Sequence, residues 1–321
     1  MGYERERAEA ILATKEAAKL CQLVRQQMVG GEAVEKLDQS PVTVADFSSQ
    51  ALICRHLMDI FGDPIVGEED ASDLRQRGAL LASVRGYLDQ AGLRGTPEKI
   101  CDWIDYGNGH VSDRYWTLDP IDGTKGFLRN DQYAVALALI VEGDVKVAVL
   151  ACPALPMKGN ETRGTLMVAV RGEGVEMMDL DSDGGTRIHV DTSGDEACHR
   201  FVESVESSHG NQALQSKVAM AVDIKAPSLR MDSQAKYAAV ARGDAVLYLR
   251  LPSLDRGRYA EKIWDHAAGA LVVEEAGGEV SDMYGKPLDF GRTERMHDNQ
   301  GVVVSNGKIH DDVIAALTRL A

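Results

Sequence analysis

Two consecutive β-hairpin patterns near the middle of the chain limit its possible folds more than any other feature. Four runs rich in apolar residues are joined in pairs by short turns that contain Gly143 and Gly172. The runs are residues 134–141, 145–150, 165–171 and 175–180. Apolar runs of strand length around short glycine-containing turns are typical of hairpins. The sequence therefore predicts an antiparallel sheet in the first half of the chain.

Helical patterns precede this sheet, and helices alternate with strands after it. Residues 5–28 are rich in helix formers, and Thr43 with Asp46 matches a capping box before an apolar stretch that ends at Phe61. Further helices are predicted at residues 73–90, 96–106, 212–220, 234–242, 265–275 and 311–320. Short strands are predicted at residues 64–66, 114–118, 245–249 and 301–304. We expect an α+β domain over residues 1–185 and an α/β domain over residues 186–321.

The composition disfavours several broad functions. The chain has 321 residues, of which 44% are hydrophobic and 26% charged, and its formal net charge is −15. This charge opposes general binding to nucleic acids or acidic membranes, and no run approaches the roughly 18 apolar residues of a membrane span. The N-terminus lacks an apolar signal core, so we expect a cytoplasmic protein. Five scattered cysteines indicate neither a disulfide framework nor a zinc site.

The segment Asp119-Pro120-Ile121-Asp122-Gly123-Thr124 has the features of a metal-dependent phosphate site. It follows a predicted strand, and Pro120, which lacks an N–H, is expected to end the strand pairing. Backbone N–H groups from Gly123 onward favour a bound anion, whereas Asp119 and Asp122 repel one. Cations would reconcile these opposite charges. Asp-Pro and Asp-Gly also occur in ordinary turns, so turn and N-cap roles remain the alternative for both acids.

Acidic residues lie at the ends of predicted elements in four separate regions. They are Asp46, Glu68 with Glu69, Asp119 with Asp122, and Asp265. Carboxylate oxygens are suitable ligands for Mg²⁺ and Mn²⁺. Structural alternatives remain open, because Asp46 occupies position N3 of the capping box and Asp265 can complement a helix dipole. Glu68 and Glu69 can equally be solvated loop charges.

Five signatures occur in a fixed order along nearly the whole chain. They are Pro41-Val42-Thr43-Val44-Ala45-Asp46, Val66-Gly67-Glu68-Glu69, residues 119–124, Trp264-Asp265-His266-Ala267-Ala268-Gly269 and Glu275-Ala276-Gly277-Gly278. In this order they resemble the inositol monophosphatase superfamily of magnesium-dependent, lithium-sensitive phosphatases. The resemblance implies the layered αβαβα sandwich shared with fructose-1,6-bisphosphatase. An antiparallel sheet is expected in the first half and a smaller mixed sheet in the second.

A second set of motifs narrows this resemblance. It comprises Lys125-Gly126-Phe127-Leu128-Arg129, Ala151-Cys152-Pro153, Ser207-Ser208-His209, Asp232-Ser233-Gln234-Ala235-Lys236-Tyr237 and Tyr248-Leu249-Arg250-Leu251-Pro252. These motifs are similar to those of the 3′(2′),5′-bisphosphate nucleotidases, which remove the 3′-phosphate from 3′-phosphoadenosine 5′-phosphate. The chain departs from the subgroup at Ala154, where relatives often have Asn, and over residues 253–261, which match no motif.

The resemblance implies roles for the motif residues. The expected ligands of Mg²⁺, or of Mn²⁺ as a substitute, are Glu68, Asp119, Asp122, Asp265 and the Ile121 carbonyl. Thr124 and Asp46 would orient the attacking water. The expected substrate-binding groups are the N–H groups of Gly123 and Thr124, together with Ser233, Lys236, Arg250 and His209.

Two other functions remain open from the sequence. The same metal site would serve a phosphatase for inositol 1,4-bisphosphate, an inositol monophosphate or a sugar bisphosphate, because substrate pockets diverge more easily than metal sites. A non-catalytic sensor of metal or nucleotide would keep the same fold, although an intact ligand set argues against it.

Overall fold

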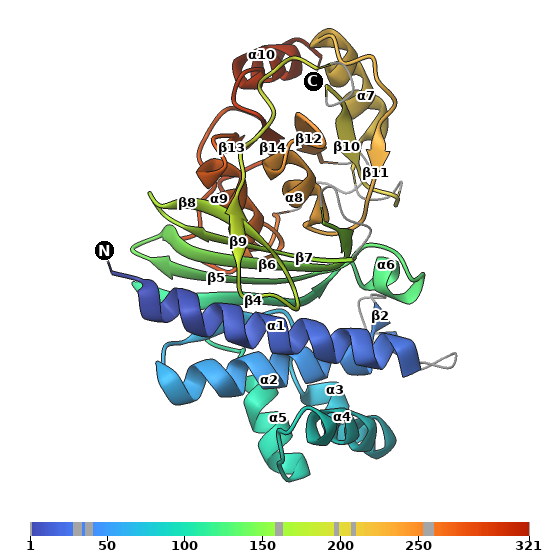
Figure 1. The fold of residues 1–321 in the computed structure, drawn as a ribbon, viewed down its shortest axis with the longest axis vertical. Coiled ribbons are helices and arrows are strands. Elements are labelled where there is room, and N and C mark those ends of the chain that lie inside the picture. The colour runs from blue at the N-terminus through green and yellow to red at the C-terminus, as the bar shows by residue number, and fades with distance from the viewer. Residues whose placement is uncertain are drawn as a thin grey trace.

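The fold is a stack of two β-sheets and three helical layers (Figure 1). The computed structural model describes residues 2–27, 34–35, 41–157, 163–195, 199–206, 210–252 and 260–320. From one end to the other, the layers are helices, a seven-stranded sheet, helices, a five-stranded sheet and helices. The expected αβαβα sandwich is therefore confirmed.

The seven-stranded sheet contains both predicted hairpins. Its strands, in spatial order, are β3 (Ile65–Gly67), β4 (Arg114–Asp122), β5 (Ala134–Val141), β6 (Asp144–Pro156), β7 (Arg163–Val170), β8 (Gly174–Asp179) and β9 (Gly185–Arg187). Only β3 and β4 run parallel, and all other neighbours are antiparallel. Helices cover both faces. This double coverage explains why β5 is apolar at nearly every position instead of alternating.

Helices α1 (Glu4–Gln27) and α2 (Val44–Ile60) cover one face of this sheet. The predicted capping box begins α2, because the Thr43 side chain accepts hydrogen bonds from the N–H groups of Ala45 and Asp46. Beyond α2 lie α3 (Ser72–Gln76), α4 (Gly78–Gln90) and α5 (Pro97–Asp105). The single helix predicted at residues 73–90 was wrong. Arg77 leaves the helical conformation (φ −120°, ψ 76°) and separates α3 from α4.

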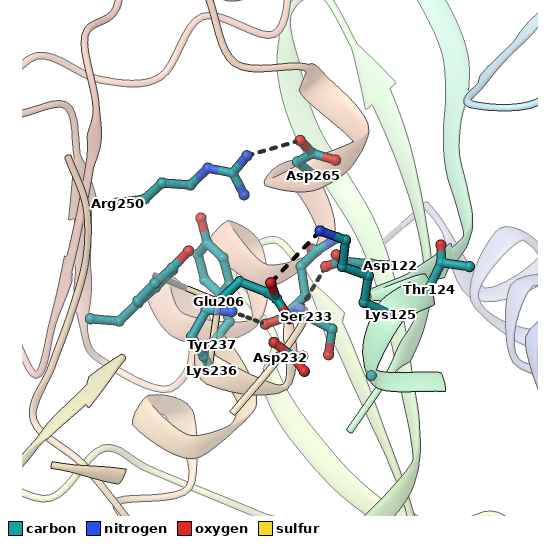
Figure 2. Close-up of a pocket in the computed structure, with 14 residues that line it drawn as sticks. Asp122, Thr124, Lys125, Glu206, Asp232, Ser233, Lys236, Tyr237, Arg250 and Asp265 are labelled. Carbon is teal, nitrogen blue, oxygen red and sulfur yellow. Dashed lines mark hydrogen bonds and ion pairs between the residues drawn. The ribbon is translucent and has the colours of Figure 1, made fainter. Parts of the chain in front are cut away.

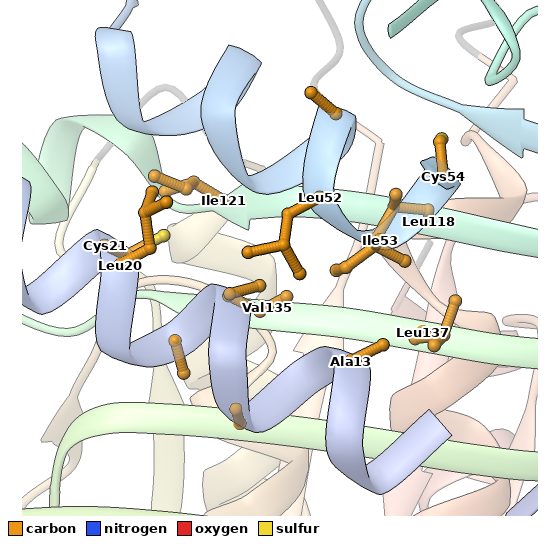
Figure 3. Close-up of a cluster of buried hydrophobic side chains, with 14 of the residues drawn as sticks. Ala13, Leu20, Cys21, Leu52, Ile53, Cys54, Leu118, Ile121, Val135 and Leu137 are labelled. Atoms are coloured by element: carbon orange, nitrogen blue, oxygen red, sulfur yellow. The ribbon is translucent and has the colours of Figure 1, made fainter. Parts of the chain in front are cut away.

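The core between these helices and the sheet consists of closely packed aliphatic side chains (Figure 3). Ala13 on α1 is fully buried, and a small side chain there lets the helix approach its neighbours closely. Ile53 on α2 and Leu118 on β4 are also fully buried. Each large aliphatic side chain stabilises the fold by roughly 1.5–3 kcal/mol. This packing holds β4, and the acids at its end, in a fixed place.

The second sheet is smaller and mixed. Its strands, in spatial order, are β11 (Leu229–Arg230), β10 (Phe201–Glu203), β12 (Leu247–Arg250), β14 (Val302–Ser305) and β13 (Glu279–Ser281). Helices α8 (Ala235–Ala241) and α9 (Ala267–Glu275) lie between the two sheets, and α7 (Gln212–Ala221) and α10 (His310–Leu320) cover the outer face. Strands β1 (Val34–Glu35) and β2 (Pro41–Val42) form a separate pair. No helix in the described part of the chain has the length and hydrophobicity needed to cross a bilayer.

The two halves of the chain share contacts through α9. The Glu275 carboxylate at its end accepts hydrogen bonds from the N–H groups of Gly172 and Gly174, at 2.9 and 2.8 Å, in the turn between β7 and β8. One apolar cluster contains residues of both sheets and of α8 and α9. The division into domains at about residue 185 stays a prediction.

The segment before α9 differs from the sequence expectation. A helix was predicted over residues 265–275, but Asp265 ends a short 3₁₀ turn, η1 (Ile263–Asp265), and α9 begins two residues later. Asp265 is therefore not in the first turn of an α-helix, and the helix-dipole explanation for this acid is weakened.

Candidate active site

A β-bulge in β4 brings two acids to the same face of the sheet. Asp119 pairs with Ala136 of β5 and Asp122 pairs with Ala134, so β4 has one extra residue between the two pairs. Residues three apart on a regular strand point to opposite faces. Here the two partners are two residues apart on β5, so both acids share one face. The prediction that Pro120 ends the strand was wrong, because pairing shifts register there and resumes at Asp122.

The charges that act on Asp119 place the other predicted acids around it. Its side chain is 1% exposed, and its Oδ1 atom has no hydrogen-bond partner. Burial raises the pKa of Asp119 well above its usual range, and the negative charges of other carboxylates raise it further. In order of effect these are Glu68, Asp122, Asp265 and Asp46. The structure therefore brings together acids that lie more than two hundred positions apart in the sequence.

Asp46 has a capping role and a second contact at the site. Its Oδ2 accepts a hydrogen bond from the N–H of Thr43 at 2.8 Å, as the capping box requires. Its Oδ1 lies 3.5 Å from Oγ1 of Thr124, which also lies 3.3 Å from the carbonyl oxygen of Ile121. Asp46 is therefore able to cap α2 with one oxygen while the other faces Thr124.

The turn after Asp122 packs directly against the second half of the chain. Gly123 has φ +84°, and helix α6 (Thr124–Leu128) follows it. A Cβ atom on Gly123 would lie 2.9 Å from the Cβ of Ser233, which itself has φ +64°. Only glycine fits this turn without strain. The close approach fixes the position of Thr124 relative to Ser233.

Asp122 connects the acids to the predicted substrate-binding residues. The N–H of Gln234, just before α8, donates to Oδ2 of Asp122 at 2.6 Å. Burial, and next the charge of Asp265, raise the pKa of Asp122 to about 6, although Lys236 and Arg250 act in the opposite direction. Asp122 therefore lies between an acidic group of residues and a basic one.

A single pocket contains most of the predicted substrate-binding residues (Figure 2). Its lining combines the acids Asp122 and Asp265 with the cations Lys125, Lys236 and Arg250. The other lining residues are Gly123, Thr124, Gly126, Glu206, Asp232, Ser233, Gln234, Tyr237 and Tyr248. A pocket with local cations in a strongly acidic protein suits an anionic ligand that would otherwise be repelled.

Lys236 is an unusually buried cation. Its side chain donates to the carbonyl of Ser233 at 2.8 Å, and its Nζ lies 5.2 Å from the centre of the Tyr248 ring. Burial lowers the pKa of Lys236 to about 8, while Asp122 raises it. A buried, partly desolvated ammonium interacts strongly with an incoming phosphate.

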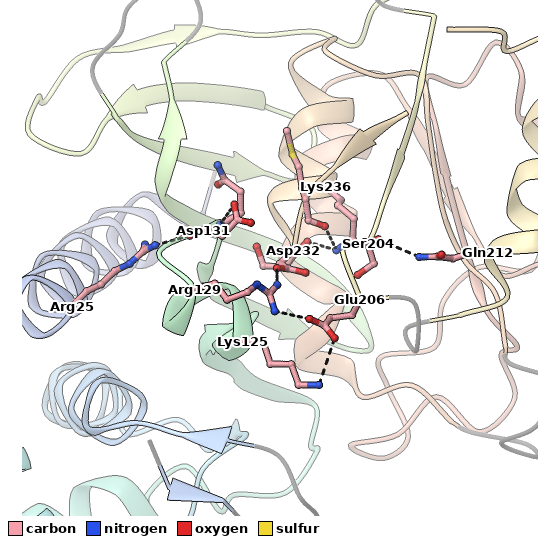
Figure 4. Close-up of polar contacts among 12 residues, drawn as sticks. Arg25, Lys125, Arg129, Asp131, Ser204, Glu206, Gln212, Asp232 and Lys236 are labelled. Carbon is pink, nitrogen blue, oxygen red and sulfur yellow. Dashed lines mark hydrogen bonds and ion pairs between the residues drawn. The ribbon is translucent and has the colours of Figure 1, made fainter. Parts of the chain in front are cut away.

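Polar contacts across the pocket include residues that the sequence did not single out (Figure 4). Arg129 forms ion pairs with Glu206, at 2.5 Å, and with Asp232. Lys125 lies 3.7 Å from Glu206. Glu206 belongs to no motif, so no local pattern indicated it. Glu261, which lies 2.8 Å from Arg250, was missed for the same reason.

Glu68 and Glu69 are neighbours in the sequence but differ in their surroundings. Glu69 is buried away from the pocket, where its N–H donates to Gln50 at 3.1 Å and its carbonyl accepts from the same side chain. The alternative interpretation of Glu69 as a solvated loop charge was therefore wrong. Glu68, by contrast, contributes to the charge around Asp119. His209 lies outside the described residues.

The donor set fits a divalent metal ion. Carboxylates that meet in a buried space repel one another strongly at short range. The unpartnered Oδ1 of Asp119 is a buried hard oxygen donor, which is the type of ligand that Mg²⁺ prefers. A bound cation would satisfy this atom and offset the repulsion.

Comparisons with known proteins identify relatives that match nearly the whole chain. The chain is 40% identical to a 3′(2′),5′-bisphosphate nucleotidase of Schizosaccharomyces pombe, over 98% of this chain and 96% of that protein. It is 41% identical to one of Emericella nidulans, over 100% and 99% of the two chains.

Solved structures share the fold at lower identity. An inositol monophosphatase from Anabaena has a TM-score of 0.65 at 19% identity, over 100% of this chain and 98% of that one. CysQ from Bacteroides thetaiotaomicron, a bacterial member of the inositol monophosphatase family, has a TM-score of 0.64 at 21% identity, over 96% and 99%. The inositol monophosphatase family model matches residues 4–320. Because this match and the relatives above extend over almost the whole chain, the chain belongs to the inositol monophosphatase family.

Proposed function

We propose that the chain is a 3′(2′),5′-bisphosphate nucleotidase that hydrolyses the 3′-phosphate of 3′-phosphoadenosine 5′-phosphate to give AMP and phosphate. The observation that carries this proposal is the pocket in which Asp122 and Asp265 lie beside Lys236 and Arg250. Such a pocket has one region for a metal-bound phosphate and another for a second phosphate. Full-length relatives at about 40% identity that bear this name support the choice of substrate.

Enzymes of this family depend on metal ions, and we propose Mg²⁺, with Mn²⁺ as a substitute, for this chain. The residues that would hold the ions are Glu68, Asp119, Asp122, Asp265 and the Ile121 carbonyl, with Asp46 placing a further ion. When bound, the ions supply charge neutralisation and a lowered pKa of coordinated water.

Thr124 and Asp46 are proposed to position the nucleophilic water. The Thr124 hydroxyl lies within hydrogen-bonding reach of both Asp46 Oδ1 and the Ile121 carbonyl. If it donates to either oxygen, its own lone pairs accept a hydrogen bond from the water and orient the water oxygen toward the 3′-phosphorus. The N–H groups of Gly123 and Thr124 would hold phosphate oxygens during in-line attack.

The second phosphate is assigned to the basic side of the pocket. Lys236 and Arg250 would bind the 5′-phosphate, because a charged guanidinium or ammonium forms strong hydrogen bonds with phosphate oxygens. Ser233, 8% exposed beside Gly123, would contact the nucleotide from the turn before α8. His209 is proposed to lie near the nucleotide. A cytoplasmic location remains a prediction.

A phosphate-release panel tests this function. Equal concentrations of 3′-phosphoadenosine 5′-phosphate, its 5′-phosphosulfate analogue, inositol 1,4-bisphosphate, inositol 1-phosphate and fructose 1,6-bisphosphate are compared with Mg²⁺ present. We expect the highest kcat/KM for one of the two adenine nucleotides. A preference for an inositol phosphate would contradict the proposal, and AMP binding without phosphate release from any compound would indicate a sensor.

A further inference from the structure

Arg250 and Glu261 form an ion pair beside the pocket. Nη2 of Arg250 lies 2.8 Å from Oε2 of Glu261. Glu261 belongs to the tract of residues 253–261 that matches no sequence motif. We propose that Glu261 is a positioning residue, which holds the Arg250 guanidinium where it binds a phosphate of the substrate. This inference rests on the proposed nucleotidase function.

The position of Arg250 depends on two competing carboxylates. The same Nη2 atom lies 3.6 Å from Oδ2 of Asp265, one of the proposed metal ligands. Without Glu261, Asp265 would be the nearest partner for the guanidinium. Arg250 would then move toward the acids of the metal site, and it would neutralise a group that the metal requires. Glu261 therefore keeps the basic and acidic regions of the pocket apart.

Glu261 is itself held in place from several sides. Its carbonyl accepts a hydrogen bond from the N–H of Met296 at 2.9 Å. Its carboxylate lies 3.5 Å from Nε2 of His266, which is fully buried. The other ring nitrogen of His266, Nδ1, lies 2.7 Å from the hydroxyl of Tyr237. These contacts restrict the movement of the Glu261 side chain. They therefore also restrict the Arg250 guanidinium that it holds.

Packing makes this support rigid. The Tyr237 ring packs directly against Gly269 of α9. A Cβ atom on Gly269 would lie 2.4 Å from the ring, so this position has no room for a side chain. The same ring packs edge-on against Tyr248, with 5.3 Å between centroids. Tyr248 lies on β12, two residues before Arg250. The strand that carries Arg250 and the helix that supports Glu261 are thus locked together.

Charge also favours a stable ion pair. The Glu261 side chain is 12% exposed and that of Arg250 is 27% exposed. Burial alone would raise the pKa of Glu261, but Arg250 and His266 together hold it at about 2. Glu261 is therefore ionised at neutral pH. The Coulomb attraction within an ion pair that is shielded from solvent is stronger than within the exposed pairs on the protein surface.

A metal ion is the alternative partner for Glu261. Ligand atoms of Glu261, Asp265 and His266 lie within 4.8 Å of one another. However, Arg250 already contacts the Glu261 carboxylate and supplies the compensating positive charge. The positioning role therefore accounts for this cluster with groups present in the chain.

The test combines Glu261→Gln with Arg250→Ala in a double-mutant cycle. Calorimetry measures the Kd for AMP, which retains the 5′-phosphate, and steady-state kinetics measures KM and kcat for 3′-phosphoadenosine 5′-phosphate. We expect Glu261→Gln to raise the Kd and KM by roughly tenfold, as for loss of a well-placed charged hydrogen bond, with a smaller change in kcat. On the Arg250→Ala background, the same change should alter the Kd by less than about twofold.

Two further variants separate positioning from general damage. Glu261→Asp, which keeps the charge, should restore part of the affinity. Glu274→Gln removes the acid of a comparable pair, in which Arg171 lies 2.6 Å from Glu274, and should leave the Kd for AMP unchanged. Thermal unfolding of each variant identifies any loss of folding.

The outcomes distinguish this inference from the function on which it rests. Tighter AMP binding by Glu261→Gln, or an equal loss of affinity with and without Arg250, would overturn the positioning role while leaving the nucleotidase activity intact. Loss of a calorimetric Mg²⁺ signal with an unchanged Kd for AMP would assign Glu261 to a metal instead. A wild-type protein that neither binds AMP nor releases phosphate would overturn the proposed function and this inference with it.

Discussion

The backbone N–H of Gln234 donates a hydrogen bond to Oδ2 of Asp122 at 2.6 Å, and this contact joins the two halves of the chain at the candidate site. Asp122 ends β4 in the first sheet, whereas Gln234 precedes α8 in the layer between the sheets. The side chain of Gln234 extends the connection, because it also accepts from the N–H of Gly269 on α9 at 3.0 Å. Gln234 therefore fixes the position of the acids of the pocket relative to its cations.

Asp119→Asn tests the contribution of one buried carboxylate. We expect kcat to fall by about a thousandfold, which is the scale for loss of one preorganised charge contact. In EDTA, however, the variant should unfold at a higher temperature than the wild type, because the repulsion around a buried acid is relieved. Phosphate release and thermal unfolding check both expectations. Near-normal turnover by the folded variant would contradict the role of Asp119.

The metal-free protein should lose stability as pH rises. Burial and the charge of Asp265 raise the pKa of Asp122 to about 6, above its ordinary value of 3.8. Asp122 therefore holds its proton more tightly in the folded state than in the unfolded state. The resulting stabilisation of the fold is fully present below pH 3.8, and it is lost as pH rises through about 6. We expect urea unfolding in EDTA to show a lower free energy at pH 7.5 than at pH 4.5, by about 1–3 kcal/mol. Addition of Mg²⁺ should remove most of this difference, and the Asp122→Asn variant should show a smaller one.

Lys236 should make substrate binding sensitive to alkaline pH. Burial lowers its pKa to about 8, so the free enzyme loses this positive charge as pH rises above that value. We expect KM for 3′-phosphoadenosine 5′-phosphate to rise above pH 8 in the wild type but to stay level in Lys236→Arg, because arginine keeps its charge. Lys236→Ala should raise KM by roughly 10–100-fold at pH 7.5, whereas Lys308→Ala, on the surface, should not. A KM that is unchanged in Lys236→Ala would favour a substrate without the second phosphate.

Gly123→Ala tests the close approach between the two halves of the chain. The substitution adds left-handed strain at φ +84° and a Cβ atom 2.9 Å from that of Ser233. Gly172→Ala is the matched control, because Gly172 has φ +80° but no atom within 4 Å of the added Cβ. Both variants should lose about 1–3 kcal/mol of stability, measured by urea unfolding. Only Gly123→Ala should also lose at least tenfold in kcat, and equal activity in the two variants would contradict the proposed importance of this turn.

Local sequence patterns predicted most elements of the fold. The hairpins around Gly143 and Gly172 were correct because strand length and turn chemistry are encoded over a few residues. The capping box at Thr43 was correct for the same reason. The break at Arg77 was missed because a strong helical pattern continues on both sides of it.

The parts of the site that sequence reasoning missed depend on contacts between distant segments. The bulge between Asp119 and Asp122 is defined by pairing with β5, which a strand pattern alone does not reveal. Glu206 and Glu261 carry no motif, and they become notable only because Arg129 and Arg250 lie beside them. Family motifs indicated the metal and substrate residues, whose assigned roles stay predictions until the variants are measured.

Anomalous diffraction from Mn²⁺-soaked crystals is the most direct test of the central claim, that the converging acids bind divalent ions. We expect at least one anomalous peak within coordination distance of both Asp119 and Asp122, with Glu68 or Asp265 completing the site. The Asp119 Oδ1 atom, which has no hydrogen-bond partner, should be a ligand. Crystals with full Mn²⁺ exposure and no peak among these carboxylates would contradict the account.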